Sequence, residues 1–271
     1  MKFKEIFFGL GLRPPAREYG FDIRDYDVPG VGKLQFAQWR HPRAGEAVPS
    51  VDELNGLKRW LKPGDVAIDI GAHSGDSTLP MALAVGPEGI VLAFEPNKYV
   101  FRILAANAGL NRIKTNIHPY PYAAGTDDGP MTFEYSDSGF CNGGRHEGIA
   151  AWTHAHFFPL EVQARNIPRL LEGLYPAATL QKLRFLKIDT EGFDHVVYKS
   201  LRPLVARTKP VIRTEMFRHT PEAQRAAYLR DLESDGYETR RMRDTTDYVG
   251  EAITAADAMR WSHYDVLAVP R

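Results

Sequence analysis

Short apolar runs alternate along this sequence with longer stretches in which apolar residues recur at helical spacing. Short runs bounded by turn residues are typical of buried strands, and a repeat of three to four residues is typical of helices. The pattern predicts strands over residues 66–70, 90–95, 113–122, 185–189, 210–215, 237–242 and 265–269. It predicts helices over about 51–61, 77–84, 97–110, 196–201 and 221–234, the first of them introduced by Ser50 and Glu53 in a capping-box pattern.

The order of these elements predicts an α/β domain with a Rossmann-like, mostly parallel sheet. The last two strands have no long helix between them, so we expect an antiparallel pair at one edge. Residues 1–48 show no regular pattern, only scattered Pro, Gly and aromatic residues. We interpret them as an N-terminal arm that packs on the domain or on a partner subunit of a homo-oligomer, and residues 49–271 as the domain itself.

The composition excludes several classes of protein. Hydrophobic residues make up 44% and charged residues 25%, which is typical of a globular enzyme. Because 34 basic residues balance 34 acidic ones, the chain carries no electrostatic footprint for nucleic acid or for an anionic membrane. No stretch approaches the roughly 20 apolar residues of a transmembrane helix. The single cysteine, Cys141, cannot form an intramolecular disulfide, so we expect a cytoplasmic protein.

A glycine-containing turn, Asp69-Ile-Gly-Ala-His-Ser-Gly75, links the first of these strands to a helix. Glycines at such a turn let the backbone approach a ligand closely. Glu95 follows Gly75 by 20 positions and ends the next strand. An acidic side chain at this distance reaches the ribose hydroxyls of a nucleotide-like cofactor. The alternative is a structural turn followed by a solvated acid.

The turn favours S-adenosylmethionine over the other common nucleotide cofactors. A Walker P-loop is excluded, because no Gly-Lys-Ser/Thr follows the turn. The spacing of Gly71 and Gly75 departs from the G-x-G-x-x-G of NAD-binding proteins. The carboxylate of Asp69 would also repel a pyrophosphate, whereas a sulfonium cofactor that carries an amine tolerates it.

Four strings resemble the FkbM family of methyltransferases: Asp69 to Thr78, Ala93-Phe-Glu-Pro-Asn97, Asn107 to Asn111, and Leu186-Lys-Ile-Asp-Thr-Glu-Gly192. Glu215 after the fifth strand fits as well. The resemblance implies a class I, S-adenosylmethionine-dependent methyltransferase domain that acts on sugar or polyketide hydroxyls. Its cofactor would contact Asp69, Gly71, Ala72, His73, Gly75, Ser77, Thr78, Glu95, Pro96, Asn97 and Asp189. Two features depart from the family pattern: His73 replaces a frequent Asn, and residues 162–170 lack a Thr-Leu-Asp that often precedes the helix.

Acidic residues at strand ends are the candidates for catalysis. Ligands bind at the carboxyl ends of the strands in an open parallel sheet. An alcohol is a poor nucleophile, so methyl transfer to oxygen needs a base or a metal ion. The candidates are Asp189, Glu191, Glu215 and His219, with His195 beside them. A divalent metal held by this set is possible but not favoured, because no spacing is diagnostic. Alternatively, Glu191 caps the following helix and Asp189 only braces the site.

The stretch from about 132 to 163 shows no alternation of helix and strand, and we interpret it as an inserted loop. Long loops inside compact domains are usually functional. Its aromatic and polar residues suit a ring-shaped polar acceptor, which Trp152 or Phe158 would line. The alternative is a lid whose aromatic side chains only pack. The residues concerned are Phe140, Cys141, Asn142, Arg145, His146, Trp152, His154, His156, Phe157 and Phe158.

These observations predict an O-methyltransferase that acts on a hydroxyl of a sugar, glycan or related small molecule. An NAD(P)-dependent oxidoreductase of the short-chain class would need a Tyr-x-x-x-Lys pair, and no tyrosine has lysine four positions later. A binding protein on an inactive methyltransferase fold is disfavoured by the intact glycine turn and Glu95. N- or carboxyl-methylation stays open, although the Asn/Asp-Pro-Pro-Tyr string of many amino-methylating enzymes is absent after the fourth strand.

Overall fold

An eight-stranded mixed sheet forms the centre of the protein in the computed structural model, which describes residues 12–141, 143–145 and 157–271. The strands are β3 (Val66–Ile70), β4 (Ile90–Phe94), β5 (Ile117–Tyr120), β10 (Leu183–Ile188), β11 (Val211–Met216), β12 (Tyr237–Arg241), β13 (Glu251–Ala252) and β14 (Tyr264–Pro270). They lie in the order β13-β12-β14-β11-β10-β3-β4-β5. Strands β5, β4, β3, β10 and β11 are parallel, and β14 runs antiparallel to both β11 and β12. The predicted fold class and antiparallel edge pair are therefore confirmed.

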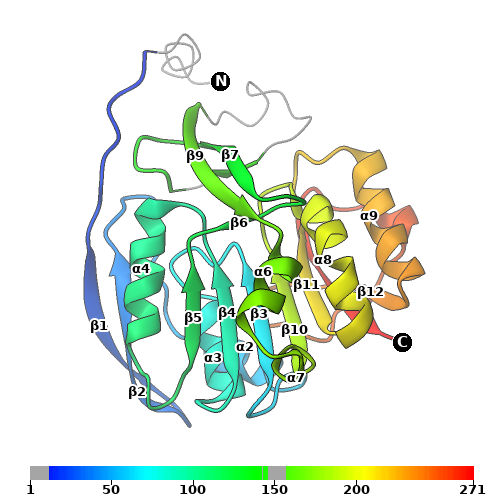
Figure 1. The fold of residues 1–271 in the computed structure, drawn as a ribbon, viewed down its shortest axis with the longest axis horizontal. Coiled ribbons are helices and arrows are strands. Elements are labelled where there is room, and N and C mark those ends of the chain that lie inside the picture. The colour runs from blue at the N-terminus through cyan, green and yellow to red at the C-terminus, as the bar shows by residue number, and fades with distance from the viewer. Residues whose placement is uncertain (1–11, 142, 146–156) are drawn as a thin grey trace.

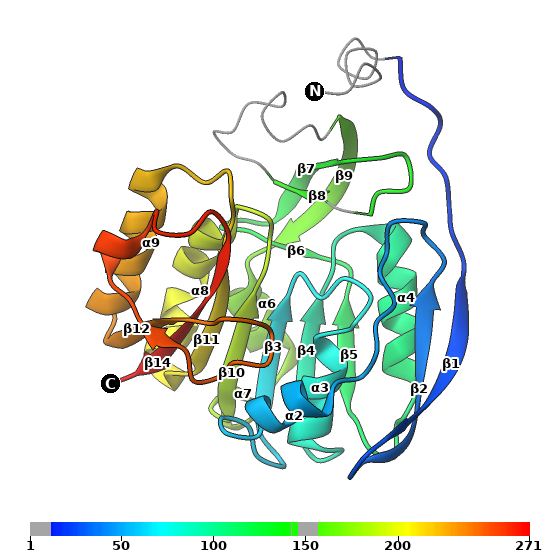
Figure 2. The same cartoon turned by 180° about the vertical axis from the view of Figure 1, so that it is seen from behind.

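Helices cover both faces of this sheet (Figures 1 and 2). One face carries α2 (Val51–Leu57), α3 (Thr78–Val85) and α4 (Lys98–Gly109), and the other carries α6 (Ile167–Leu174), α7 (Ala177–Leu180), α8 (Asp194–Thr208) and α9 (Glu222–Ser234). Alternating strand residues supply the two cores. Ile68 packs toward α8, and Ala67 packs toward α2 and α3. In the described part of the chain, none of the helices has the length and apolar character needed to span a bilayer.

The five predicted helices are present, but the one expected over 196–201 continues to Thr208 as α8, and α6 and α7 were not predicted. The strand expected over 113–122 is shorter and covers only residues 117–120. It lies at the edge of the sheet, where Pro119 costs little because an edge residue has no partner on its outer side. The helix expected to reach residue 61 ends at Leu57, although Leu61 is still part of the core.

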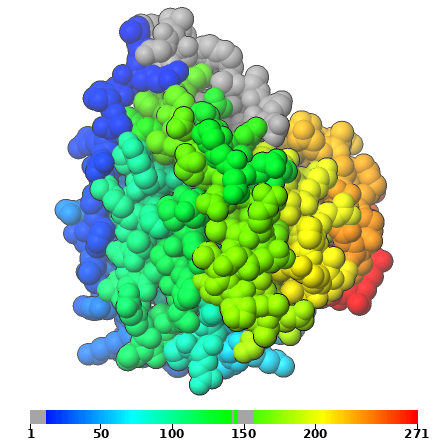
Figure 3. Space-filling view, viewed as in Figure 1, coloured from blue at the N-terminus to red at the C-terminus, as the bar shows by residue number. Residues whose placement is uncertain are grey.

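The prediction that residues 1–48 are irregular is wrong. Residues 21–39 form an antiparallel hairpin of β1 (Phe21–Val28) and β2 (Gly32–Trp39). Gly30 and Gly32 adopt left-handed φ angles of 74° and 81° in the turn between the strands. Strand β2 packs on α4, where Asn107 accepts the backbone N–H of Ala37 at 2.6 Å. The hairpin thus lies beside α4 (Figure 1) and forms one flank of the molecule (Figure 3).

The prediction of an unstructured loop over 132–163 is also wrong at both ends. Strands β7 (Gly129–Tyr135) and β9 (Phe158–Arg165) pair antiparallel, and β6 (Ala123–Ala124) and β8 (Gly143–Gly144) complete a second sheet. Phe158, Val162 and Ala164 are buried at alternating positions, a strand pattern that the sequence interpretation overlooked. This small sheet lies over the carboxyl ends of the central strands (Figure 1).

Candidate functional site

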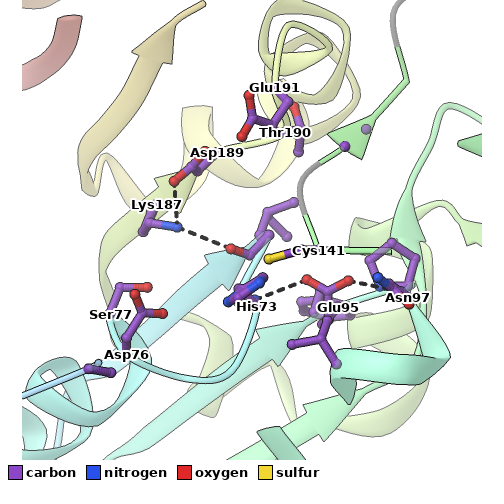
Figure 4. Close-up of a pocket in the computed structure, with 18 of the residues that line it drawn as sticks. His73, Asp76, Ser77, Glu95, Asn97, Cys141, Lys187, Asp189, Thr190 and Glu191 are labelled. Carbon is purple, nitrogen blue, oxygen red and sulfur yellow. Dashed lines mark hydrogen bonds and ion pairs between the residues drawn. The ribbon is translucent and has the colours of Figure 1, made fainter. Parts of the chain in front are cut away.

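A cavity of about 550 Å³ opens where the carboxyl ends of β3, β4 and β10 meet the small sheet. Its volume is in the range of small-molecule and cofactor sites. Several of the predicted cofactor and catalytic residues line it (Figure 4), namely Gly71, His73, Ser77, Glu95, Pro96, Asn97, Asp189 and Glu191. The cavity is also bordered by the segment from Glu46 to Ser50, which spans the predicted boundary between the N-terminal arm and the domain at residue 48.

Four of the predicted cofactor residues do not line the cavity but build its floor. These are Asp69, Ala72, Gly75 and Thr78, all buried. The Asp69 carboxylate accepts hydrogen bonds from Ser77 Oγ at 2.9 Å and from Thr78 Oγ1 at 2.7 Å. It thereby fixes the start of α3 to the end of β3.

Gly71 is required by the close approach of the neighbouring strand β10. A Cβ atom added there would lie 1.8 Å from the carbonyl oxygen of Asp189. The φ of Gly71 is 79°, in the left-handed region. The glycine turn is therefore locked against the end of β10, and any side chain at Gly71 would separate them.

Glu95 is held at the cavity wall by backbone donors. Its Oε2 accepts the N–H of His73 at 2.9 Å, and its Oε1 accepts the N–H of Asn97 at 2.8 Å (Figure 4). Burial raises the pKa of Glu95 to about 7, although these two hydrogen bonds oppose the shift. A carboxylate has about four acceptor sites, so Glu95 can still accept hydrogen bonds from a ligand.

Sequence reasoning missed a row of buried charges that crosses the sheet beneath the cavity. Asp69, Lys187 and Arg213 are directly paired on β3, β10 and β11, and we call them the charged row. Lys187 Nζ lies 3.3 Å from Asp69, 3.2 Å from Asp189 and 3.2 Å from the carbonyl of Gly71. Burial lowers the pKa of Lys187, but the carboxylates of Asp189 and Asp69 outweigh it and raise the pKa well above its usual value. The sequence contains one signal for this row, because Lys187 lies within the Leu186–Gly192 string that resembles the FkbM family.

The turn after β10 presents Glu191 to the cavity. Glu191 has a left-handed φ of 56°, and the buried Asp194 accepts hydrogen bonds from Thr190 Oγ1 and the N–H of Gly192. The alternative in which Glu191 caps α8 is not supported, because Phe193 occupies the N-cap position without a side-chain cap bond. Burial and the nearby charge of Asp189 raise the pKa of Glu191 to about 7.

Three candidates for catalysis lie outside the cavity lining. Glu215 Oε1 lies 3.2 Å from His263 Nε2, and burial raises the pKa of Glu215 well above its usual value. His219 packs its ring edge against Phe217. His195 bonds to Asp231 at 2.7 Å and so joins α8 to α9. Within the described ranges, no group of three His, Cys, Asp or Glu side chains is arranged to hold a metal ion.

The described part of the predicted loop both packs in the interior and borders the cavity, which Phe133 and Tyr135 help to line. Phe140, Phe157 and Phe158 are buried. Cys141 lines the cavity, and burial raises the pKa of its thiol to about 12, so it is protonated at neutral pH. The guanidinium of Arg145 lies over the ring of Phe193, 5.1 Å from its centre. The other candidates of this loop lie outside the described residues: Asn142, His146, Trp152, His154 and His156.

The glycine turn, Glu95 and the turn after β10 all lie within a region that matches a known family. Residues 69–247, about two thirds of the chain, match the family model of the methyltransferase FkbM domain. The chain belongs to the FkbM methyltransferase family. The resemblance that the four sequence strings indicated is thus confirmed, and the protein is a methyltransferase by family.

This FkbM-family chain is also similar to one curated protein and to several solved structures. It is 29% identical over 184 residues to a protein-L-isoaspartate O-methyltransferase of Triticum aestivum, covering 66% of this chain and 68% of the relative. Among solved structures, an FkbM methyltransferase from Methylobacillus flagellatus KT is similar with 14% identity and a TM-score of 0.44, over 79% of this chain and 50% of that one. TYW2 of P. horikoshii, in complex with MeSAdo, shows 12% identity and a TM-score of 0.43, over 91% and 69%.

Proposed function

We propose that this FkbM-family methyltransferase takes its methyl group from S-adenosylmethionine and transfers it to a hydroxyl oxygen of a sugar, glycan or related small molecule. The observation that carries the proposal is the charge of the cavity. Six of its described lining residues are acidic and two, Lys187 and Arg213, are basic. The acidic ones are Glu46, Glu53, Asp76, Glu95, Asp189 and Glu191.

An acidic cavity fits a cationic cofactor and disfavours a phosphorylated one. S-adenosylmethionine carries a sulfonium and an amine, both of which are attracted by carboxylates. The pyrophosphate of NAD would lie among these carboxylates without an excess of positive charge to balance it. The charge of the cavity therefore supports the methyltransferase assignment against the oxidoreductase alternative.

The residues present also match the other parts of such a cofactor. Glu95 would accept hydrogen bonds from the ribose hydroxyls, because its carboxylate faces the cavity and is fixed by the N–H groups of His73 and Asn97. Val100, Phe133 and Tyr135 supply apolar and aromatic lining that suits a purine ring. Gly71 would allow the backbone of the turn to approach the ligand.

When bound, the cofactor would supply an electrophilic methyl group on sulfur. The chain must then align the acceptor and take up its proton. We propose that Glu191 takes up the proton of the acceptor hydroxyl. Glu191 lines the cavity, and its pKa of about 7 suits a general base near neutral pH. Glu215 and His219 lie outside the cavity lining and take no part in this step, and Asp189 would hold Lys187 in place.

A hydroxyl acceptor is favoured over a carboxylate, although the relative from Triticum aestivum is named for methylation of isoaspartate. A carboxylate acceptor would be repelled by the acidic residues of the cavity, and it would need no base. A neutral hydroxyl is not repelled, and Glu191 provides the base that it needs. The cytoplasmic location and the homo-oligomer stay predictions, as do the boundary at residue 48 and the role of residues 132–163 in binding the acceptor.

Methyl transfer from ¹³C-methyl-labelled S-adenosylmethionine tests the proposal. The acceptors would be a panel of neutral sugars and glycans together with an isoaspartyl peptide. We expect a labelled methyl ether on a sugar oxygen, stable to mild base and visible by NMR and mass spectrometry. A base-labile methyl ester on the peptide, or a label on nitrogen, would contradict the hydroxyl assignment.

A further inference from the structure

Glu53 is placed differently from the capping residue that its sequence pattern suggests. In a capping box, the Ser50 side chain binds the N–H of the third helical residue, and that residue's side chain returns to the N–H of the cap. Only the first half is present, with Ser50 Oγ accepting the N–H of Glu53 at 3.2 Å. The Glu53 carboxylate instead lines the cavity.

The carboxylate of Glu53 is mostly but not fully buried, and few protein groups hold it in place. Its side chain is 15% exposed, and its ion pair within the described residues is with Arg213 at 3.5 Å. Arg213 makes shorter contacts elsewhere, donating to Asp265 at 2.7 Å and to the hydroxyl of Tyr248 at 3.2 Å. Glu53 makes no hydrogen bond through its carboxylate to any described residue, so it keeps acceptor sites for a ligand.

Lys187, the other cation near Glu53, already has an acceptor for each of its N–H bonds. Lys187 has three N–H bonds, and its three close acceptors are Asp69, Asp189 and the carbonyl of Gly71. Asp76 adds a second carboxylate on the same side of the cavity, since its charge acts on Glu53. At this end of the cavity, the negative charge of the carboxylates therefore exceeds the positive charge of Lys187 and Arg213. A cationic group of a ligand would balance this excess.

The position of Glu53 relative to Glu95 indicates which part of a ligand it would meet. Glu53 contacts Arg213 of β11, whereas Glu95 follows β4, and β10 and β3 lie between these strands. Strands are about 4.8 Å apart, so the two carboxylates lie toward opposite ends of the cavity. A ligand whose ribose is bound by Glu95 would extend its other end toward Glu53.

We propose that Glu53, supported by Asp76, binds the ammonium group at the amino-acid end of the cofactor and makes the cavity selective for nucleosides that carry this end. The inference rests on the proposed use of S-adenosylmethionine. It adds a specificity-determining residue that lies before the region matched by the family model, which begins at residue 69. Nucleosides that lack the amino acid, such as 5′-methylthioadenosine, would not contact Glu53.

Calorimetric titration with S-adenosylhomocysteine and with 5′-methylthioadenosine separates this role from a structural one. A charge-assisted hydrogen bond lost in Glu53→Gln should weaken S-adenosylhomocysteine binding about ten- to a hundredfold. Binding of 5′-methylthioadenosine should change by less than about twofold. Asp52→Asn is the matched control, because Asp52 lies beside Glu53 on α2 but is exposed and does not line the cavity. It should leave both affinities unchanged.

A titration of the unaltered protein tests the same inference without a variant. Burial raises the pKa of Glu53 to about 7, so the carboxylate ionises between about pH 6 and 7.5, where the amine of the ligand stays cationic. The preference for S-adenosylhomocysteine over 5′-methylthioadenosine should rise several-fold over this range, while the ionisation of Glu95 affects both ligands and cancels. The charged and titratable groups that face Glu53 are Asp69, Asp76, Lys187, Arg213 and Tyr248.

Two results would overturn the inference. Equal losses of affinity for both ligands in Glu53→Gln would show that Glu53 has only a structural role. Unchanged affinity for S-adenosylhomocysteine would show that Glu53 does not bind the ligand. Failure of the unaltered protein to bind either S-adenosylmethionine or S-adenosylhomocysteine would instead overturn the proposed function, and the inference with it.

Discussion

Lys187 Nζ lies 3.3 Å from the Asp69 carboxylate, and both side chains are almost completely buried. This contact joins β10 to β3 directly beneath the glycine turn, because Lys187 also donates to the carbonyl of Gly71. A buried ion pair contributes little net stability, but the loss of one partner leaves an uncompensated charge. The floor of the cavity therefore depends on Lys187.

Lys187→Met should destabilise the protein by roughly 3–5 kcal/mol, since the buried carboxylate of Asp69 and the partly exposed one of Asp189 lose their common partner. It should also weaken the binding of S-adenosylhomocysteine. The matched control is Lys199→Met, because Lys199 is half exposed and 3.9 Å from Asp231, so its loss should cost less than about 0.5 kcal/mol. Urea unfolding of both variants gives the comparison. Equal stability of Lys187→Met and the unaltered protein would show that the row is not a structural element.

Glu95→Ala should weaken the binding of S-adenosylhomocysteine about ten- to a hundredfold, because a buried charged acceptor is lost. The loss should be similar for 5′-methylthioadenosine, which keeps the ribose. Glu88→Ala, at an exposed turn residue away from the cavity, serves as the control for a change of charge. An unaltered calorimetric affinity in Glu95→Ala would remove Glu95 from the ribose site.

The ligand-free protein should lose stability as the pH rises from about 5 to 8. Three cavity carboxyl groups, Glu53, Glu95 and Glu191, have pKa values raised to about 7 from an ordinary 4.5. Between these values the folded state binds more protons than the unfolded state, so stability falls with pH. The melting temperature should drop by several degrees, because one kcal/mol corresponds to roughly 2–4 °C.

Scanning calorimetry across this range measures the drop. Asp247, with its pKa lowered to about 2, affects stability only at lower pH. Histidines with a lowered pKa, such as His73, oppose the drop below about pH 6.5, whereas Asp194 and Glu215, whose pKa values are also raised, add to it. Glu191→Gln should flatten the dependence, since one of the three groups no longer ionises. A melting temperature that rises over the same range would mean that folding does not raise the pKa values of these carboxyl groups.

Glu191→Gln should lower kcat about a hundredfold or more with the acceptor that the methyl-transfer assay identifies, because general-base help is worth this much. Its affinity for S-adenosylhomocysteine should stay within about twofold. Glu215→Gln should have a smaller effect on kcat, since Glu215 faces His263 rather than the cavity. EDTA should leave the activity unchanged. Full activity of Glu191→Gln, or activity that EDTA removes and magnesium restores, would contradict the assignment of the proton to Glu191.

The sequence predicts the parts of the fold and site that follow from strand ends. Apolar runs and helical repeats locate the central strands, and the carboxyl ends of parallel strands share one edge. This rule is enough to place Glu95, Asp189 and Glu191 at the same edge of the sheet. It does not give the direction of a side chain, and for this reason Glu215 is at the correct edge of the sheet but turns toward His263.

The missed residues depend on pairing across strands or on segments distant in sequence. Lys187 and Arg213 become neighbours only through the register of β10 and β11. Glu53 satisfies a capping pattern, so its local sequence does not show that the carboxylate faces a cavity. The hairpin of β1 and β2 did have a signal, since Pro29-Gly30 lies between two stretches that contain β-branched and aromatic residues.

Calorimetric titration of the unaltered protein with S-adenosylmethionine and with NAD tests the central claim most directly. The acidic cavity and Glu95 predict that S-adenosylmethionine saturates the protein at one molecule per chain, with no measurable binding of NAD at the same concentrations. Saturable binding of NAD without binding of S-adenosylmethionine would contradict the account.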